Sequence, residues 1–477
     1  MSHAGGGAES GATGTPELGG NTAAGGAITA GSTSKGGATQ ASGGASEDPG
    51  GGAGGATLGT GGAAPEAVCS PVLARQGKLV ASSDAHLEAL RGVSYLNGDL
   101  EISGTVADLS ALACLTSVRG QLYVHDTSAL LNFTGLGELT QVTSDVRLMK
   151  NSALTSLDGL DKLAFIGRNL VIGDWVQQRI VGGEFISVPA GNPLLTDLRA
   201  LRGLGHVAND LLIQCNDSLT NLDGLESVTR VNSVTLQQNV ALANVNGLQG
   251  LTDAGEVLLI DRNFLLRDLN GLAHLRRVAV VNVRSNDVLQ SLDGLSQVRG
   301  ENVGVVVAYN AALTSVEGLS GLTTLSNLII DDNTKLSSLH GLRNVPSIAE
   351  DLVIERSNAL TSLDGLDQLT SIGSSLSLRA NLLLASIESL QSLTSVGADF
   401  DVTGNVTLAS LHGLEQLGSI GGNVAINSNG ALTSLHALSG LRQLGGTLSI
   451  NYNPLPSCEL DWLNASIAGN SASVTCP

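Results

Sequence analysis

Leucine and other apolar residues repeat through most of this chain with a period of 23 or 24 residues, and this repeat limits the folds open to it. Between Leu363 and Ile387 they first recur every three positions and then alternate at Leu376 and Leu378. Spacing of three matches a 3-10 turn, and alternation matches a short strand with one buried face. We therefore predict an all-β solenoid, with one long parallel sheet and a 3-10 or irregular opposite side.

The same frame fits about fifteen coils. No coil could bury its own leucines, so neighbouring coils must stack them into one continuous core. At a strand spacing of ~4.8 Å the stack would form a rod of roughly 70 Å. The coils begin at Leu87, Leu109, Phe133, Leu157, Leu198, Leu222, Val245, Leu269, Leu292, Val316, Leu339, Leu363, Ile387, Leu411 and Leu435.

An asparagine follows the strand segment in most coils. Stacked inside the bend, its amide would satisfy backbone groups that the turn leaves unpaired, so we assign it a structural role. The glycine that recurs on the 3-10 side, as in Gly294, is interpreted as easing a tight corner. The asparagines are Asn151, Asn192, Asn216, Asn239, Asn263, Asn286, Asn310, Asn333, Asn381, Asn405, Asn429 and Asn453.

These motifs resemble leucine-rich repeats, and more closely the receptor L-domain type found in bacterial surface proteins and growth-factor receptor ectodomains. In IGSSLSLRANLLLASI and IGGNVAINSNGALTSL, two residues rather than one separate the asparagine from the next leucine. The resemblance covers roughly residues 87 to 455. It implies a solenoid that recognises proteins, peptides or sugars outside the cell, and it implies no catalytic residue.

The chain divides by composition into three parts. Residues 1–66 contain 22 glycines and no hydrophobic period, which predicts a flexible tether. Residues 67–457 form the solenoid, and residues 458–477 form a C-terminal cap. The first residues show no secretory signal, so we expect a signal or lipid-attachment segment upstream of Met1.

The five cysteines suggest an oxidising compartment. Cys69 and Cys114 flank the start of the repeat, while Cys458 and Cys476 bracket its end. We predict two terminal disulfides, with Cys215 left over. The alternative is five buried free thiols in a reducing compartment.

Residues between the two inward strand positions should point outward, and most of them are apolar in the middle of the chain. Stacked, they would form a stripe of roughly 35 Å, long enough for an interface. The alternative is that β-branched residues simply suit strands. The column contains Val171, Leu212, Thr235, Leu259, Asn282, Val306, Ile329 and Val353.

One insertion, residues 174–190, interrupts the repeat between a strand and its asparagine. Two apolar arms around Gly182 and Gly183 predict a β-hairpin. Trp175 and Phe185 are two of its apolar side chains. We expect the hairpin either to lie on the outward face near Leu212 or to help form a partner's pocket there.

Residues that could bind a metal or take part in catalysis give weaker evidence of function. Glu388, His412 and His436 occupy one repeat column, but a polar turn explains that column better than zinc. Asp351, Glu355, Asp399 and Asp401 form an acidic cluster near the C-terminal end, which a solvated face would also explain. The chain has no GxSxG, HExxH, CxxC or P-loop motif, so we predict no catalytic residue, no metal and no cofactor.

Together these features predict a recognition module at the cell surface, with a protein or glycan as its partner. The formal net charge of −19 disfavours nucleic acid, and no apolar run is long enough to span a membrane. Alternatives are an adhesive rod that self-associates and, more weakly, a carbohydrate-active enzyme. The proposed partner-binding residues are Trp175, Phe185, Leu212, Leu259, Val306, Ile329 and Val353.

Overall fold

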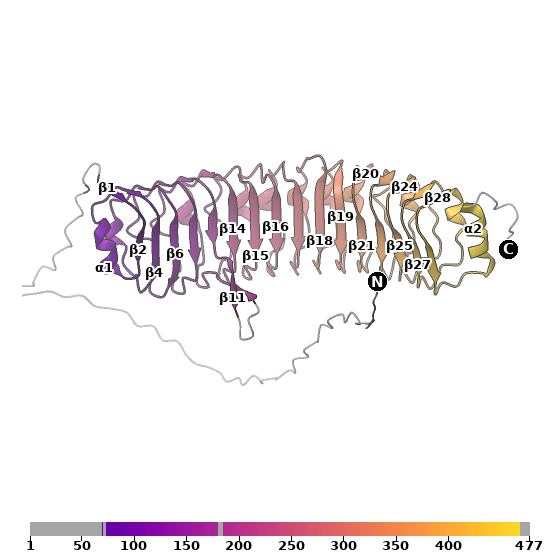
Figure 1. The fold of residues 1–477 in the computed structure, drawn as a ribbon, viewed down its shortest axis with the longest axis horizontal. Coiled ribbons are helices and arrows are strands. Elements are labelled where there is room, and N and C mark those ends of the chain that lie inside the picture. Colours follow the sequence, from indigo (N-terminus) through magenta and orange to yellow (C-terminus); the bar gives the residue numbers. More distant parts are fainter. Residues whose placement is uncertain (1–68, 70–72, 180–184, 468–477) are drawn as a thin grey trace, which may run out of the picture. The chain divides into compact units, whose positions relative to one another are not determined.

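The computed structural model describes Cys69 and residues 73–179 and 185–467. All of these belong to the second of two units into which the chain divides, Ala64–Pro477. Within this unit the coils stack in a single row, as Figure 1 shows. The predicted tether, residues 1–66, lies outside the described residues.

One parallel sheet runs along the whole row of coils, to which each coil contributes a strand. Neighbouring strands pair so that inward residues stack, as Leu258 does on Val281. The predicted all-β solenoid is therefore confirmed. The strands of this long sheet are β2 (Leu79–Ala81), β4 (Leu100–Gly104), β6 (Leu122–Thr127), β8 (Val146–Met149), β10 (Leu170–Ile172), β14 (Asp210–Gln214), β15 (Ser233–Gln237), β16 (Val257–Asp261), β17 (Val280–Arg284), β18 (Val303–Ala308), β19 (Leu325–Asp331), β21 (Leu352–Glu355), β23 (Leu376–Arg379), β25 (Phe400–Thr403), β27 (Val424–Asn427) and β29 (Leu448–Asn451).

A second row of short parallel strands lies at the corner that precedes the long sheet. It occurs in two sets, near the two ends of the solenoid. The first set is β1 (Ala74–Gln76), β3 (Tyr95–Asn97), β5 (Ser117–Val118), β7 (Gln141–Val142), β9 (Phe165–Ile166) and β13 (His206–Val207), and the second is β20 (Ser347–Ile348), β22 (Ser371–Ile372), β24 (Ser395–Val396), β26 (Ser419–Ile420) and β28 (Gln443–Leu444). Between the sets, this corner retains the single bridges Arg230 to Asp253 and Asp253 to Arg277.

The opposite side carries the predicted 3-10 turns. Its recurrent glycine has a sharper role than easing a corner, because coils approach closely there. A Cβ on Gly294 would lie 1.8 Å from the Leu269 carbonyl oxygen of the preceding coil. The 3-10 helices are η1 (Glu88–Leu90), η2 (Ser110–Leu112), η3 (Arg199–Leu201), η4 (Asn246–Leu248), η5 (Asn270–Leu272), η6 (Asp293–Leu295), η7 (Glu317–Leu319), η8 (His340–Leu342), η9 (Glu388–Leu390) and η10 (His436–Gly440).

The inward leucines, isoleucines and valines of all coils form one continuous buried core. Short helices cover its two ends: α1 (Asp84–Leu87) and α2 (Cys458–Ile467). Trp462 and Leu463 of α2 are buried against the last coil, as expected for a cap that shields an otherwise open end. No helix in residues 73–179 or 185–467 is long and apolar enough to cross a lipid bilayer.

The asparagine ladder is the most regular feature of the solenoid. Asn263 donates from Nδ2 to the Leu236 carbonyl oxygen of the preceding coil at 2.9 Å. Asn286 Oδ1 accepts the Asn263 backbone N–H at 3.1 Å, and the pattern repeats from coil to coil. These side chains are fully buried, so the predicted structural role is confirmed. Ser357 replaces the asparagine in one coil: its Oγ donates to the Glu355 carbonyl oxygen, and its backbone N–H still donates to Asn381 Oδ1 at 3.0 Å.

The residue before the ladder position adopts the left-handed backbone conformation in most coils, which the sequence pattern did not predict. For non-glycine residues this conformation costs about 1 kcal/mol or more, and the ladder hydrogen bonds hold it in place. These residues, with φ between 49° and 59°, are Lys150, Cys215, Gln238, Arg262, Ser285, Tyr309, Asp332, Arg356, Ala380, Ser428 and Tyr452.

The cysteines follow the disulfide prediction rather than the free-thiol alternative. Cys69 and Cys114 form a disulfide that joins the start of the described chain to the second coil. Cys458 is also disulfide-bonded, whereas its predicted partner, Cys476, lies outside the described residues. Cys215 is a buried free thiol, and burial raises its pKa to about 11. Five free thiols are therefore the wrong interpretation of the cysteines.

Candidate functional site

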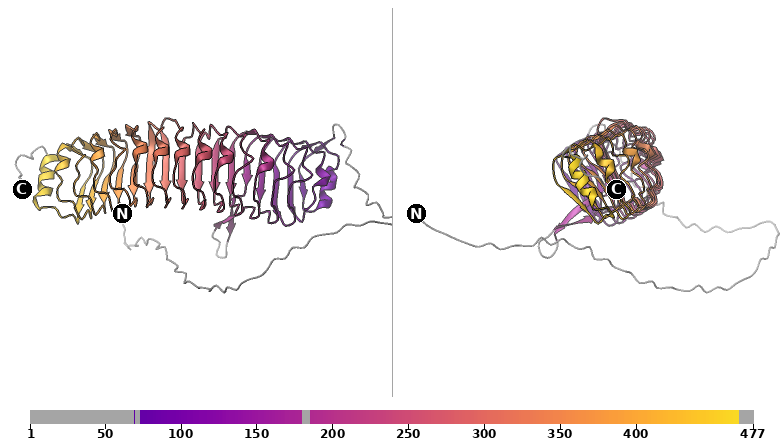
Figure 2. Two further views of the ribbon diagram at one scale, coloured as in Figure 1. Left: turned by 180° about the vertical axis from the view of Figure 1, so that it is seen from behind. Right: turned by 90° about the vertical axis from the view of Figure 1, so that its right-hand side faces the viewer.

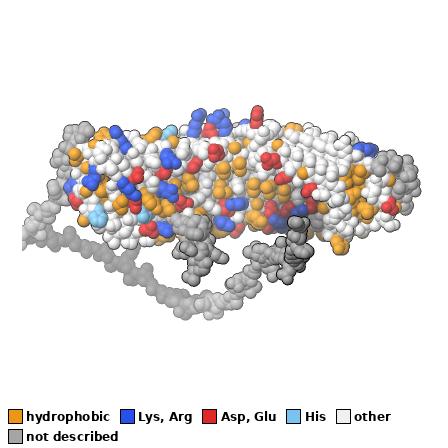
Figure 3. Space-filling view, viewed as in Figure 1, with side chains coloured by type: hydrophobic (Ala, Val, Ile, Leu, Met, Phe, Trp, Pro, Cys, Tyr) orange, Lys and Arg blue, Asp and Glu red, His pale blue; other side chains and the backbone are white. Residues whose placement is uncertain are grey.

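The predicted outward residues form an unbroken column on the long sheet, which we call the apolar column. Strand pairing places each member directly beside the next, from β10 to β21. Val171 is buried and the other members are half-buried. Figure 3 shows hydrophobic side chains gathered over these strands. The column consists of Val171, Leu212, Thr235, Leu259, Asn282, Val306, Ile329 and Val353.

A second column, which the sequence reasoning did not identify, runs beside the first on the same face. We call it the polar column. Its members are the residues two positions further along each strand, so writing the coils in register would have revealed it. The column consists of Gln214, Gln237, Asp261, Arg284, Ala308, Asp331, Glu355 and Arg379.

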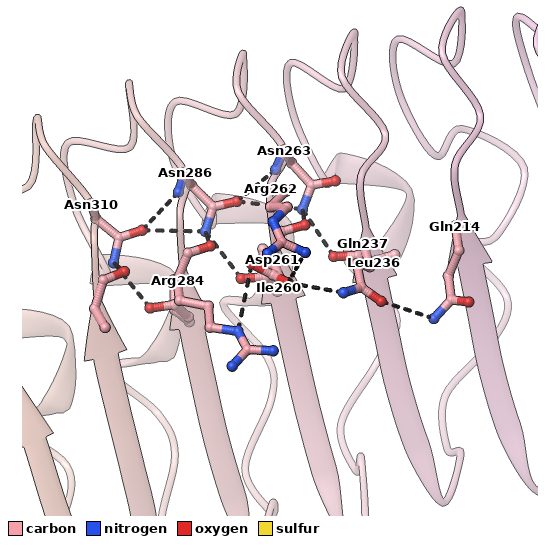
Figure 4. Close-up of polar contacts among 12 residues, drawn as sticks. Gln214, Leu236, Gln237, Ile260, Asp261, Arg262, Asn263, Arg284, Asn286 and Asn310 are labelled. Atoms are coloured by element: carbon pink, nitrogen blue, oxygen red, sulfur yellow. Dashed lines mark hydrogen bonds and ion pairs between the residues drawn. The ribbon is translucent and has the colours of Figure 1, made fainter. Parts of the chain in front are cut away.

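Hydrogen bonds and ion pairs connect the polar column from coil to coil (Figure 4). Gln237 Nε2 donates to Asp261 Oδ2 at 2.9 Å, and Arg284 Nε lies 3.5 Å from Asp261 Oδ1. The Asp261 side chain is only 1% exposed. Further along, Arg356 pairs with Asp331. The apolar column is thus bordered by charges that are fixed in position by one another.

Several acceptor oxygens on this face are buried and receive no hydrogen bond from the described residues. They are Gln214 Oε1, Asp261 Oδ1, Asn282 Oδ1, Asp331 Oδ1 and Asp401 Oδ1. Leaving such a group without any partner costs about 1–3 kcal/mol, so we expect water or a partner's donor to satisfy these oxygens.

The acidic cluster predicted from the sequence is assembled at the C-terminal end of the apolar column. Asp351, Glu355, Asp399 and Asp401 line a hollow of about 360 Å³ over β21 to β27. The hollow forms because the outward residues after Val353 become small or short, as Ser377, Asp401 and Ala425.

One arginine partly neutralises this acidic hollow. Arg379 Nε donates to Asp401 Oδ2 at 3.0 Å. The hydrogen bond to Asp401 raises the pKa of Arg379 above its ordinary value, against the opposing effect of burial. Ser377 Oγ donates to Glu355 Oε1 at 2.8 Å. The hollow therefore retains an excess of negative charge and suits a partner's ammonium or guanidinium group.

At the N-terminal end the outward face is aromatic and charged. The Tyr123 and His125 rings stack with centroids 4.1 Å apart, and the Arg147 guanidinium lies 5.9 Å from the Tyr123 ring centroid. Arg147 also donates to Asp174 Oδ2 at 2.9 Å. Because Asp174 is the first residue of the insertion, this contact joins the insertion to the outward face.

The insertion contains the predicted hairpin, formed by β11 (Trp175–Arg179) and β12 (Phe185–Pro189). The strands are antiparallel, with Trp175 opposite Pro189 and Phe185 opposite Arg179. The ribbon projects from the solenoid beyond the carboxyl end of β10 rather than lying on the outward face (Figures 1 and 2). The Gly182–Gly183 turn lies outside the described residues.

The ladder continues across the insertion without interruption. Asn151 Nδ2 donates to Asn192 Oδ1 at 2.9 Å, although 41 residues separate the two in sequence. Gly173 and Gly191 mark the exit and return of the chain. A Cβ on Gly191 would lie 1.6 Å from the Cys215 carbonyl oxygen, so only glycine fits there.

The column weighed for zinc is only partly brought together, because His412 lies near Glu388 while His436 pairs with a carboxylate outside the column. His412 Nδ1 lies 2.6 Å from Glu415, and its Nε2 lies 3.7 Å from Glu388. His436 Nδ1 lies 3.1 Å from Glu459 of α2. Within the part of the chain that the structure describes, no three His, Cys, Asp or Glu side chains are grouped to hold a metal ion.

No family model and no curated protein matches the sequence. Among solved structures, the chain is similar to an internalin (inlF) from Listeria monocytogenes, with a TM-score of 0.35 and 14% sequence identity. That alignment covers 78% of this chain and 84% of the internalin chain. A similarity at this level assigns the chain no function.

Proposed function

We propose that this protein is a non-catalytic recognition module of the cell surface or extracellular space, which binds a protein through the outward face of the long sheet. The observation that carries the proposal is the apolar column, bordered along its length by the charged polar column. Protein interfaces combine an apolar centre with a polar rim in this way.

A protein fits this face better than a glycan does. The column presents aliphatic side chains such as Leu259 and Ile329, whereas surfaces that bind neutral sugars rely on aromatic platforms. Its eight members span roughly 35 Å at strand spacing, a length that suits a protein interface. The acidic hollow would accept basic side chains of the partner. Trp175 and Phe185, on the hairpin beside β10, would add contacts at one end.

We place the protein outside the reducing cytoplasm. The Cys69–Cys114 disulfide favours an oxidising compartment. We assign the coils to the receptor L-domain type of leucine-rich repeat, on the spacing between the asparagine and the next leucine. Residues 1–66 would act as a tether that holds the solenoid away from its point of attachment.

Paired aspartate substitutions on one coil test the proposal. Full-length protein is immobilised and used to capture partners from the surface and secreted proteins of its own source. We expect Leu259→Asp to weaken capture of a specific protein at least about thirtyfold, as loss of an interface hot spot would. Leu265→Asp is the matched control, because Leu265 belongs to the same coil but lies away from the long sheet and is 52% exposed.

The outcomes separate the alternatives. Equal loss of binding in both variants would mean that the outward face is not the site. If the wild type forms a homo-oligomer in light scattering that Leu259→Asp abolishes, the face mediates self-association and the protein is an adhesive rod. Binding to neutral oligosaccharides that requires Leu259 would make the partner a glycan, and release of sugar from a polysaccharide would indicate an enzyme.

A further inference from the structure

Strand pairing at the corner that precedes the long sheet is lost in the middle of the solenoid, and the lengths of the coils explain why. Coils beginning at Leu222, Leu269 and Val316 have 23 residues, while those between them have 24. The shorter coils lose one residue at this corner. The buried residues Val278 and Val281 are three positions apart, whereas Ile348 and Leu352 are four apart.

Where coils of 23 and 24 residues alternate, neighbouring coils cannot pair residue for residue at this corner. Two-residue strand pairs form where consecutive coils have 24 residues, as between β20 and β22. In the middle they are replaced by the single bridges of Asp253 with Arg230 and Arg277. Backbone hydrogen bonds between coils persist here, as from Val231 N–H to the Asp253 carbonyl oxygen, but the strand pairing is interrupted. A hollow of about 660 Å³ lies against this corner.

Arginines line this hollow, which we call the arginine groove. Arg230, Arg276, Arg277 and Arg299 border the 660 Å³ hollow, although the whole chain of 477 residues has only 24 Lys and Arg. A second hollow of about 350 Å³ adjoins it and shares Arg230. Figure 3 shows basic side chains gathered at the edge of the solenoid above the middle strands.

Two carboxylates, Asp253 and Glu301, also line the groove, so its four arginines leave an excess of positive charge. Asp253 pairs with Arg277 and accepts the Gly255 backbone N–H at 3.0 Å. Burial alone would raise the pKa of Asp253, but the Gly255 N–H and the Arg277 guanidinium outweigh it and lower the pKa, so the carboxylate stays ionised. Arg276 is exposed, and its guanidinium has no carboxylate or other acceptor among the residues that the structure describes.

Arg299 is exposed, but its guanidinium is held in place by the backbone. Its Nη1 donates to the carbonyl oxygens of Ser296 and Val298, at 2.8 Å in each case. A Cβ on Gly321 would lie 1.6 Å from this nitrogen, so the glycine makes room for the guanidinium. The remaining N–H groups of Arg299 stay available to an anion, since a guanidinium has five donors.

We propose that the arginine groove binds an acidic polysaccharide, at a site separate from the outward face. Arg276 and Arg299 lie on adjacent coils, ~4.8 Å apart along the axis, so both can reach one sulfate or carboxylate group. Arg230, two coils before Arg276, would meet a second group further along the same polymer. Thr323, on the coil after Arg299, also lines the groove and offers a hydroxyl to a sugar.

Other polyanions fit the groove less well. Its lining has no aromatic or large apolar side chain, which a peptide would need as an anchor and single-stranded nucleic acid would need for base stacking. The formal net charge of −19 further opposes nucleic acid, whose binding rests on long-range attraction to phosphates.

The test measures binding of the full-length protein to dextran sulfate, poly-L-glutamate and neutral dextran by thermophoresis. We expect the dextran sulfate affinity of an Arg276→Ala/Arg299→Ala variant to fall at least about tenfold, since two charge-assisted contacts are lost. Arg442→Ala is the matched control. Arg442 occupies the same repeat position as Arg299, with Nη1 donating to the Ser439 and Leu441 carbonyl oxygens, in a coil without other groove arginines.

The expected result is binding to dextran sulfate that weakens with salt, a loss confined to the double variant, and no binding to neutral dextran. Leu259→Asp should bind dextran sulfate normally, because the outward face is a different site. Absence of binding by the wild type at low salt overturns the proposal, as does equal loss in Arg442→Ala. Tighter binding to poly-L-glutamate would overturn the assignment to a polysaccharide.

Discussion

The two corners that flank each strand of the long sheet differ in what they tolerate. After the strand, the asparagine ladder keeps one geometry in coils of either length and continues across the insertion. Before the strand, pairing rests on two residues per coil and gives way where coil lengths alternate. A corner held by buried side-chain hydrogen bonds stays uniform, while a corner held by a minimal strand pair is free to diversify.

This difference explains where the hairpin and the arginine groove occur. The hairpin leaves the solenoid at the ladder corner without disturbing it, because Asn192 still occupies the ladder. At the other corner, the loss of two-residue strand pairing leaves the arginine groove. Four experiments test this contrast, beginning with the largest expected effect.

Removing one ladder asparagine should be far more damaging than removing an outward asparagine of the same coil. In Asn286→Ala, the Asn263 backbone N–H and Nδ2 lose their shared acceptor, and the Ile260 carbonyl loses its donor. We expect the free energy of unfolding to fall by about 3 kcal/mol or more. Urea unfolding measures it, with Asn282→Ala as the control, expected to cost under about 1 kcal/mol. Equal effects would contradict the special role of the ladder.

The thiol at the ladder corner should be nearly unreactive. Cys215 is 4% exposed and has a pKa of about 11, against an ordinary value of 9.0. At pH 8 its thiolate fraction is therefore about a hundredfold lower than that of an ordinary cysteine. Iodoacetamide labelling followed by mass spectrometry should give a rate at least that much slower in the native protein than in urea. Rapid native labelling would show that this corner opens.

Equalising the coil lengths should close the arginine groove. One alanine added between the corner and the strand in each of the coils that begin at Leu222, Leu269 and Val316 gives every coil in this region 24 residues. Two-residue pairing should then form, and dextran sulfate affinity should fall about tenfold although every arginine remains. Hydrogen exchange would report new protection at the Arg230 amide, since the Arg277 amide already donates to the Thr252 carbonyl oxygen. Unchanged protection would refute coil length as the cause.

Glycine should have opposite effects at the two corners. Ala380 is left-handed at the ladder corner, with φ of 54°, so Ala380→Gly should raise the free energy of unfolding by roughly 1 kcal/mol. Ala279 precedes β17 at the other corner and is not left-handed, so Ala279→Gly should lower that energy by about 0.5–1 kcal/mol. Thermal and urea unfolding of both variants give the comparison. Destabilisation by Ala380→Gly would mean that its backbone is not strained.

Much of the fold follows from residues that the sequence displays openly. The apolar frame of a coil such as Leu363 to Ile387 predicts the strand, the 3-10 side and the buried core together, because inward positions must be apolar in every coil. The Cys69–Cys114 disulfide and the order of the apolar column from Val171 to Val353 are likewise readable from position in the repeat.

Other features depend on neighbours in adjacent coils. The pairing of Gln237 with Asp261, and of Arg379 with Asp401, joins residues 22 to 24 positions apart whose side chains meet only after stacking. The direction of the hairpin could not be predicted either. Its apolar residues favoured contact with the outward face, but β11 and β12 project beyond the strand ends.

The sequence by itself determined the architecture, because a period of 23 or 24 residues with inward leucines has no other way to bury its apolar surface. Only the tertiary structure decided which outward residues become neighbours, where the left-handed positions lie and where strand pairing is lost. Those outcomes arise from contacts between coils, and a difference of one residue between adjacent coils is enough to change them. The candidate sites lie on the surface that this stacking creates.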